Sequence, residues 1–324
     1  MEKQFNNLDE QILKFKSRNL KIENEEKAKD YLLYNNYYNV SNYFGKFFMI
    51  ETDKYEDGTT FNNLMSLHHF DKEIKSIFFK YIIESEKHVK SIISYRYSEY
   101  YKDMSYPYLE ITNYSKDCDI LELANFISSL SNLIKSQKNG KNSISHYIQK
   151  YNHVPLWILT NYMTYGQISK FYSYIPATLK NQIAKDMNEF LKINNQLKES
   201  ILTQEQLESY LFNIVEFRNV IAHNNKILDF KCKKNTLYNK YICKKYNLDK
   251  NSQRKDVFNV FITLTCFLEE QEFIQLNNSL SKRINKLKKQ VSEKHFKKIL
   301  SSIGFPDELE KIQQYNAKTH TKSN

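Results

Sequence analysis

Apolar residues recur at helical spacing along most of the chain, most clearly over residues 70–97. Ile74, Phe78 and Val89 belong to a stripe there that repeats every three or four positions. Because an α-helix turns once in about 3.6 residues, such a stripe falls on one face. The pattern therefore predicts one long amphipathic helix, with Asp71 near its start as a cap or dipole partner.

The same spacing predicts helices elsewhere, and no stretch alternates convincingly in the way that predicts a strand. Further helices are expected over residues 118–137, 155–175, 206–223, 256–280 and 280–300. Residues 51–63 and 136–143 are polar and rich in turn formers, so we expect connections there. Residues 226–248 fit a loop or a short hairpin. The pattern as a whole predicts an all-α fold.

The composition also favours helices. Only 5 glycines and 4 prolines occur among 324 residues, well below the usual shares of roughly 7% and 5%. An architecture built on many tight turns, such as a β-sandwich or barrel, is therefore disfavoured. A chain of this length can bury a substantial core without disulfides or metals.

The cysteines and the apolar runs bear on metals, compartment and membrane. Cys118, Cys232, Cys243 and Cys266 form no CxxC pair and have no histidine at zinc-finger spacing, so we expect no structural zinc and no other cofactor. The sequence has no signal-peptide pattern and no apolar run of roughly 18 residues. We therefore expect a cytoplasmic protein with reduced thiols and no membrane partner.

The net charge of +11 is concentrated in the last third of the chain. Residues 1–225 hold 27 Lys and Arg against 27 Asp and Glu, whereas residues 226–324 hold 21 against 10. A localised basic segment suits a polyanion, although exposed lysines without a function would give the same count. We expect a helical domain over residues 1–230, followed by a basic, mainly helical extension over residues 231–324.

The candidate chemistry lies in residues 216–225, EFRNVIAHNN. On a helical wheel the apolar residues nearby gather within about 60° and predict the core face: Tyr210, Ile214, Phe217 and Ile221. Arg218 sits at the margin of that face, and Asn219 and His223 share the opposite side. Arg218 and His223 are about 140° apart, so a second surface has to close any common site. Spacing alone also fits a surface arginine and a helix-ending histidine, followed by Asn224 as a left-handed cap.

Four separated stretches favour the functional interpretation: LLYNNYYNVSNYFGKFF (32–48), FDKEIKSIFFKYIIESEKHVKSII (70–93), PLWILTNYMTYGQISKFYSYI (155–175) and FRNVIAHNNKI (217–227). In this order they resemble the Abi-like abortive-infection proteins of bacteria, of the AbiD/AbiF type. A fifth stretch, LSSIGFP (300–306), lies near the end. Arg218 and His223, with Asn219 after the arginine, resemble the R-x4-H motif of HEPN ribonucleases. Asn161 departs from the family pattern, in which an acidic residue would follow Trp157 by four positions.

The resemblance implies a HEPN-type helical bundle with additional N- and C-terminal helices, and a metal-independent endoribonuclease. The 2′-hydroxyl of RNA would attack, leaving a 2′,3′-cyclic phosphate, so the protein has to move protons and stabilise a phosphorane. His223 can move protons near neutral pH. Arg218 offers a fork of donors that stays charged, and Asn219 would hold the imidazole or contact the phosphate. A homodimer, also implied by the resemblance, would join two motifs in one composite groove.

The basic extension supplies a candidate track for RNA. Its positive residues, with tyrosines between them, include Lys231, Lys233, Lys234, Lys244, Lys245, Arg254 and Lys255. Positive charges between stacking surfaces suit a nucleic-acid backbone. The partners expected are therefore substrate RNA, a second copy of the chain, and a regulatory small RNA or a protein that restrains a toxin.

Alternative interpretations stay open. A HEPN fold can bind RNA without cutting it, and the C-terminal basic helix also fits a membrane surface or acidic proteins. Glu84 or Glu86 would either orient the motif or belong to a solvated face. His68 and His69 fit capping or loop positions better than a metal site. The aromatics that follow Trp157 fit a core better than a stacking platform.

Overall fold

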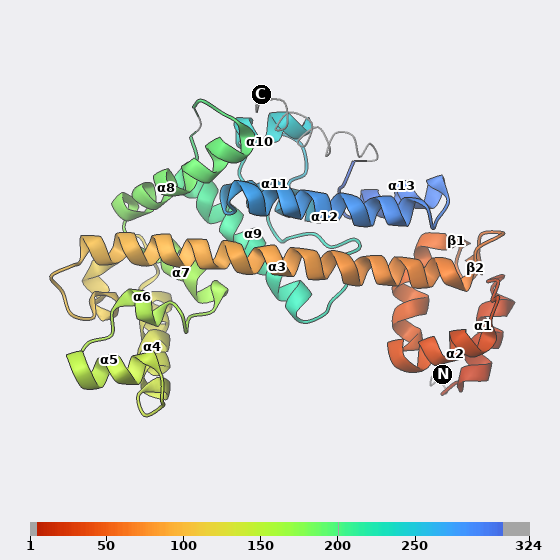
Figure 1. Cartoon of the computed structure of the whole chain (residues 1–324), viewed down its shortest axis with the longest axis horizontal. Coiled ribbons are helices and arrows are strands. Elements are labelled where there is room, and N and C mark those ends of the chain that lie inside the picture. Colours follow the sequence, from red (N-terminus) through yellow and green to blue (C-terminus); the bar gives the residue numbers. More distant parts are fainter. Residues whose placement is uncertain (1–4, 200, 307–324) are drawn as a thin grey trace, which may run out of the picture. The chain divides into compact units, whose positions relative to one another are not determined.

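Helices make up most of the chain in the computed structural model, which describes residues 5–199 and 201–306 (Figure 1). Within these ranges the strands are β1 (Met49–Glu51) and β2 (Lys54–Tyr55), a short antiparallel hairpin. The all-α prediction is therefore confirmed. The hairpin adds local pairing just where the sequence predicted only a connection.

Packing divides the chain into two compact units that interleave along the sequence. The first comprises Met1–Phe79, Val220–Phe230 and Ile274–Asn324, and the second comprises Lys80–Asn219 and Lys231–Phe273. Three long helices supply residues to both units: α3 (Phe61–Tyr100), α9 (Gln204–Ala222) and α12 (Glu270–Lys288). These units differ from the linear division at residue 230, and they do not test whether residues 1–230 form one domain in the family sense. That division stays a prediction.

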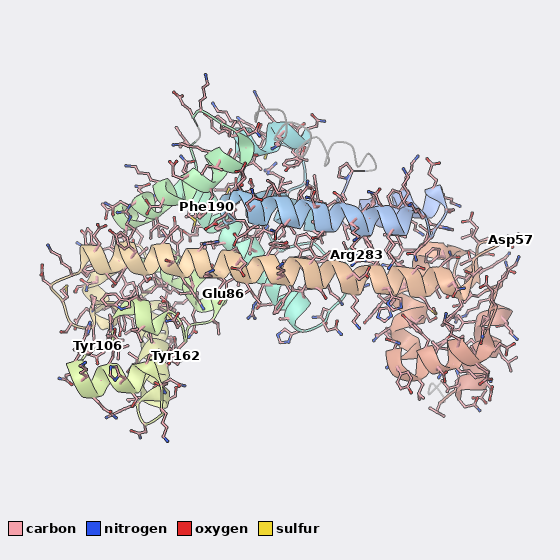
Figure 2. All side chains as sticks on the ribbon, in the orientation of Figure 1. Asp57, Glu86, Tyr106, Tyr162, Phe190 and Arg283 are labelled. Atoms are coloured by element: carbon pink, nitrogen blue, oxygen red, sulfur yellow. The ribbon has the colours of Figure 1, made fainter. Side chains whose placement is uncertain are left out.

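The first unit gathers short helices around the beginning of α3. They are α1 (Leu8–Ser17), α2 (Glu25–Asn35), the π-helical turn η1 (Asn39–Phe44), the 3-10 turn η2 (Gly45–Phe48) and α13 (Glu293–Ser302). Asn7 begins α1 through a capping box with Glu10, which satisfies donors that a helix start leaves free. Within this unit Arg283 of α12 reaches Glu73 of α3 at 3.2 Å (Figure 2).

The second unit is built from the remainder of α3 and the helices between residues 107 and 266. These are η3 (Pro107–Leu109), η4 (Ile111–Asn113), α4 (Ile120–Gln137), α5 (Ser143–Tyr151), α6 (Leu156–Leu159), α7 (Tyr165–Tyr174), α8 (Ala177–Asn195), α10 (Lys240–Cys243), η5 (Lys244–Tyr246), α11 (Val257–Thr263) and η6 (Leu264–Cys266). Arg96 on α3 donates to both carboxylate oxygens of Asp186 on α8, at 2.6 and 2.7 Å. On the same helix pair, the ring of Phe190, which is labelled in Figure 2, lies 5.4 Å from the ring of His88.

Three predicted helices are broken, because side chains provide caps that periodicity does not reveal. The helix predicted over 155–175 is interrupted before Thr164, whose side chain forms a capping box with Gln167. The one predicted over 256–280 ends at Thr263 and resumes at Glu270, and Asn194 donates to two carbonyls in the break. The one predicted over 280–300 is divided by Ser292, the N-cap of α13.

The long helix is predicted correctly in kind but begins too late. α3 starts at Phe61 rather than near residue 70. Asp71 therefore lies inside the helix and caps nothing in it. His68 and His69 are helical residues too, which corrects the expectation of capping or loop positions.

The aromatics on α7 confirm the expectation of a core. Tyr165, Phe171 and Tyr172 are almost inaccessible, whereas Trp157 on α6 is half exposed. Asn161, which stands where an acidic residue was expected, donates to the carbonyl of Trp157 at 3.2 Å.

Candidate functional site

The R-x4-H motif lies at the end of α9, labelled in Figure 1. The predicted core face is confirmed, since all four of its apolar residues are buried: Tyr210, Ile214, Phe217 and Ile221. Burying this stripe fixes the rotation of the helix about its own axis. The positions of the remaining side chains around α9 follow from it.

The three motif side chains are available to a ligand. Arg218 is half-buried, Asn219 is exposed on the last turn, and His223 is exposed in the turn that follows the helix. Across residues 5–199 and 201–306, none of the three side chains makes a hydrogen bond or an ion pair. Arg218 and Asn219 belong to the second unit, whereas His223 belongs to the first.

Arg218 differs from every other arginine of this chain. The other four bond to carboxylates or to backbone carbonyls: Arg18, Arg96, Arg254 and Arg283. The Nε of Arg218 is buried without a hydrogen-bond partner in the described structure. A buried donor left without an acceptor costs free energy, so the Nε of Arg218 contributes no stabilising hydrogen bond to the described structure.

The turn after the motif is fixed by backbone and side-chain bonds. Asn224 adopts a left-handed conformation with φ of 53° and donates its amide N–H to the carbonyl of Ile221 at 3.0 Å. The next amide, that of Asn225, reaches the carbonyl of Val220 at 3.0 Å. The predicted left-handed cap at Asn224 is therefore confirmed, and it positions His223 immediately before the cap.

A buried carboxylate attaches this turn to α3 within the first unit. Asp71, only 1% exposed, accepts the backbone N–H of Ile227 at 2.9 Å. Its other oxygen lies 2.8 Å from Nζ of Lys75, which also donates to Oδ1 of Asn224 at 2.9 Å. These contacts make the loop after His223 part of a rigid frame. The sequence indicated Asp71 only as a cap and gave no sign of Lys75, because their partners in this turn lie 156 and 149 positions away.

The basic segment runs along α9 within the second unit. Ser209 accepts the N–H of Leu237 at 3.0 Å, the side chain of Asn213 donates to the carbonyl of Lys234 at 3.0 Å, and Glu216 accepts the N–H of Lys233 at 3.0 Å. As the residue numbers rise along α9 from Ser209 to Glu216, the bonded residues of the segment fall from Leu237 to Lys233. The segment therefore runs antiparallel to the helix. Lys233 and Lys234 therefore lie beside the turns of α9 that precede Arg218.

The predicted RNA-binding residues differ in accessibility. Lys233, Lys234, Lys244 and Lys245 are exposed, while Lys231 and Lys255 are half-buried. Lys231 lies 3.5 Å from a carboxylate oxygen of Asp256. Nζ of Lys234 lies 5.7 Å from the ring centroid of Phe212, an exposed aromatic on α9. A cation and an accessible ring thus adjoin on the motif helix.

Arg254 does not belong with these exposed lysines, and its expected role is corrected. Only 8% of it is exposed. Its Nε donates to the carbonyl of Thr236, and its Nη1 donates to the carbonyls of Asp249, Lys250 and Ser252 at 2.8–3.1 Å. The loop has no helical amides to satisfy these carbonyls, so the guanidinium does so and is not free for phosphate.

The acidic candidates on α3 bond to neighbours on their own helix. Glu86 pairs with Lys90 at 2.8 Å, and Glu84 lies 3.4 Å from Lys87 (Figure 2). The first pair is four residues apart and the second is three apart, which are the spacings that bring side chains together on a helix surface. No bond links either glutamate to the motif within the described part of the chain.

Two further features of the described residues concern membranes and metals, and the family follows from comparison with known proteins. In the described ranges no helix is long and apolar enough to span a bilayer, and no three His, Cys, Asp or Glu residues are grouped to hold a metal. Neither curated proteins nor solved structures gave a match. A family model described as Abi-like protein matches residues 30–229, which is more than half of the chain and includes the motif. The chain therefore belongs to the family of Abi-like proteins.

Proposed function

We propose that this Abi-like protein is a HEPN-type endoribonuclease of bacterial abortive-infection defence, a toxin that cuts RNA with Arg218 and His223. One observation carries the proposal: among the five arginines, Arg218 alone lacks a partner in the described structure. It stands one residue before Asn219 and five before His223, and both of these are also free to bind. An unpaired guanidinium and an unpaired imidazole in one motif suit a phosphodiester better than they suit folding.

The chemistry follows from the residue types. His223 takes the proton of the RNA 2′-hydroxyl or returns one to the leaving 5′-oxygen. The guanidinium of Arg218 donates to phosphate oxygens as the phosphorane gains negative charge, and it keeps its own charge at all working pH values. Asn219 contributes an amide to the phosphate or to the imidazole. The products are a 2′,3′-cyclic phosphate and a 5′-hydroxyl.

A second copy of the chain completes the site. By helical spacing alone, positions 218 and 223 are about 140° apart around a helix axis, so a single copy would not surround a phosphate. Phe212 and Asn219 are exposed on one side of α9, and a two-fold partner would meet that side with its own motif. The homodimer we propose therefore has one composite groove, in which each chain supplies an arginine and a histidine.

RNA reaches this groove along the basic segment. Lys233 and Lys234 are exposed and attached to α9 through backbone bonds of their own segment. Their ammonium groups track a phosphate backbone, and Phe212 offers a ring for a base. A restraining small RNA or protein would compete for the same lysines. We also propose that the enzyme acts in the cytoplasm, where host RNA is available.

The test is cleavage of RNA in EDTA by the full-length protein, with the new 3′ ends identified chemically. His223→Ala and Arg218→Ala should each lose activity on the order of 10²-fold or more. His146→Ala is the matched control, because His146, on α5, is an exposed histidine like His223, and it should cleave like wild type. Cleavage retained after both motif substitutions would refute the assignment of the site.

A second candidate function is RNA binding without cleavage. Neither ring nitrogen of His223 is held by any residue in the described ranges, so nothing within one chain selects its tautomer. A histidine that only contacts phosphate needs no such selection. RNA that binds tightly and stays intact with wild type under all conditions supports this alternative.

A further inference from the structure

An open pocket of about 560 Å³ lies in the first unit, and one wall is the loop that directly follows His223. The other walls come from η1 and α3. Polar and aromatic residues of its lining include Asn39, Tyr43, His68, Lys75, Asn225 and Lys226. The volume falls in the range of roughly 300–1,000 Å³ that small-molecule sites occupy.

The walls of this pocket are held in place before any ligand arrives. Asp71 accepts the N–H of Ile227 and pairs with Lys75, and Lys75 in turn holds the side chain of Asn224. The loop wall is thus bonded to the helix wall. A preformed pocket loses less conformational entropy on binding than a flexible one.

Lys226 is the cation of this pocket that has no carboxylate bonded to it in the described structure. Of the two aspartates in the lining, Asp71 pairs with Lys75. Asp229 pairs with Lys46. Burial and the neighbouring ammonium of Lys46 lower the pKa of Lys226, and the nearby carboxylates of Asp229 and Asp71 only partly oppose that shift. Neither carboxylate is bonded to Lys226, so a bonded anionic partner is missing. An anionic ligand would supply that partner.

The rest of the lining suits a nucleobase. Nζ of Lys226 lies 4.5 Å from the centroid of the half-buried Tyr43 ring. The side-chain amides of Asn39 and Asn225 are exposed and make no hydrogen bond within the described ranges. Each amide offers both donors and an acceptor, as base edges require. Burial also lowers the pKa of His68, which favours a neutral ring in this wall.

We propose that the pocket binds one nucleotide of the RNA, next to the nucleotide that is cut. The base lies against Tyr43, with its edge toward Asn39 and Asn225, and a phosphate pairs with Lys226. The pocket then sets the position of the chain relative to His223 and gives cleavage a base preference. This inference rests on the proposed function, because it assumes that the RNA meets the motif.

The experiment measures binding apart from cleavage. Full-length His223→Ala protein is titrated with a labelled single-stranded RNA of about ten nucleotides, and separately with adenosine and guanosine monophosphates. In this background Lys226→Met, which keeps the aliphatic stem, and Tyr43→Ala should each weaken RNA binding about tenfold or more. Lys226→Arg keeps the cation and should bind within about threefold of the parent.

Lys150→Met is the matched control, since Lys150 also lies over a tyrosine ring, at 5.3 Å from that of Tyr151, but on helix α5 rather than in the pocket loop. It should change RNA binding less than twofold. If RNA binds and Lys226→Met and Tyr43→Ala bind like the parent, the pocket proposal is overturned while the proposed function stands. If the monophosphates alone depend on Lys226, the pocket is a site for free nucleotides and the RNA proposal is overturned. No RNA binding by any variant overturns both.

Discussion

Replacing Arg218 by methionine tests whether the motif arginine is kept for function rather than for folding. In the folded chain its Nε is buried without an acceptor, and an unmet buried donor costs about 1–3 kcal/mol. Methionine removes that donor and retains much of the apolar volume. We therefore expect Arg218→Met to leave the free energy of unfolding unchanged, or to raise it by up to about 1 kcal/mol, while RNA cleavage falls on the order of 10²-fold or more.

Arg96→Met is the matched comparison, because Arg96 has the partners that Arg218 lacks. Its guanidinium donates to Asp186 at 2.6 and 2.7 Å and to Glu99 at 2.9 Å. Hydrogen bonds to charged groups contribute about 1.5–3 kcal/mol each, but solvent screens a side chain that is 29% exposed. The expected loss for Arg96→Met is therefore about 1–3 kcal/mol, with cleavage retained in the folded protein.

Urea unfolding followed by circular dichroism gives both free energies, and the slope with urea checks that the same surface unfolds in each variant. Cleavage is measured on the same preparations well below the transition. The reasoning is refuted if Arg218→Met destabilises the protein as much as Arg96→Met does. Arg218 would then have a structural role, and the lost activity would report misfolding.

Three further outcomes are expected. Asp71→Ala should destabilise the protein by about 3–5 kcal/mol, because it leaves Lys75 without its carboxylate. Asp71→Asn should destabilise it less, because the amide oxygen still accepts the N–H of Ile227. Equal losses of the free energy of unfolding in urea would contradict the hydrogen bonds described for Asp71. Replacing Lys233 and Lys234 by glutamine should reduce the slope of log Kd against log salt for single-stranded RNA by about 0.7 per lysine, whereas an unchanged slope would remove both from the RNA track. Burial lowers the pKa of both His68 and His295, so each histidine binds fewer protons in the folded chain than in the unfolded chain. The free energy of unfolding should therefore be highest above about pH 6.5 and fall as the pH drops below it. In unfolding experiments from about pH 7.5 to 5, His68→Gln should make that fall less steep.

The elements that local periodicity determines were predictable from the sequence. The stripe of Tyr210, Ile214, Phe217 and Ile221 is buried as expected, because a helix on the surface of a core has to bury its one apolar face. The same logic identified α3 and α4. The motif could be placed on α9 for the same reason, since knowing which side is buried fixes which side is not.

The features that depend on distant partners were not predictable. Asp71 looked like a cap because its acceptor oxygens are the same in a cap and in a bond to Ile227. Arg254 looked like an RNA ligand because nothing in its neighbours shows that it would meet the carbonyls of a folded loop. The course of residues 232–239 along α9 depends on side chains of Ser209 and Glu216, which no apolar pattern reveals.

The arrangement of bonds around α9 favours a shared site over a self-contained one. Glu216 holds the basic segment, and by helical spacing Asn219 lies about 60° from it around the axis while Arg218 lies about 160° away. On the proposed function, RNA guided by the lysines of that segment would therefore arrive on the side of Asn219, not on the side of Arg218. Arg218 would not be approached by the RNA that its own chain guides, and no described residue neutralises its charge. In the proposed function, Arg218 therefore acts on RNA guided by the other copy. The dimer that we propose thus gives the unpaired guanidinium and the basic segment one explanation, because in it each would serve RNA only when two chains combine.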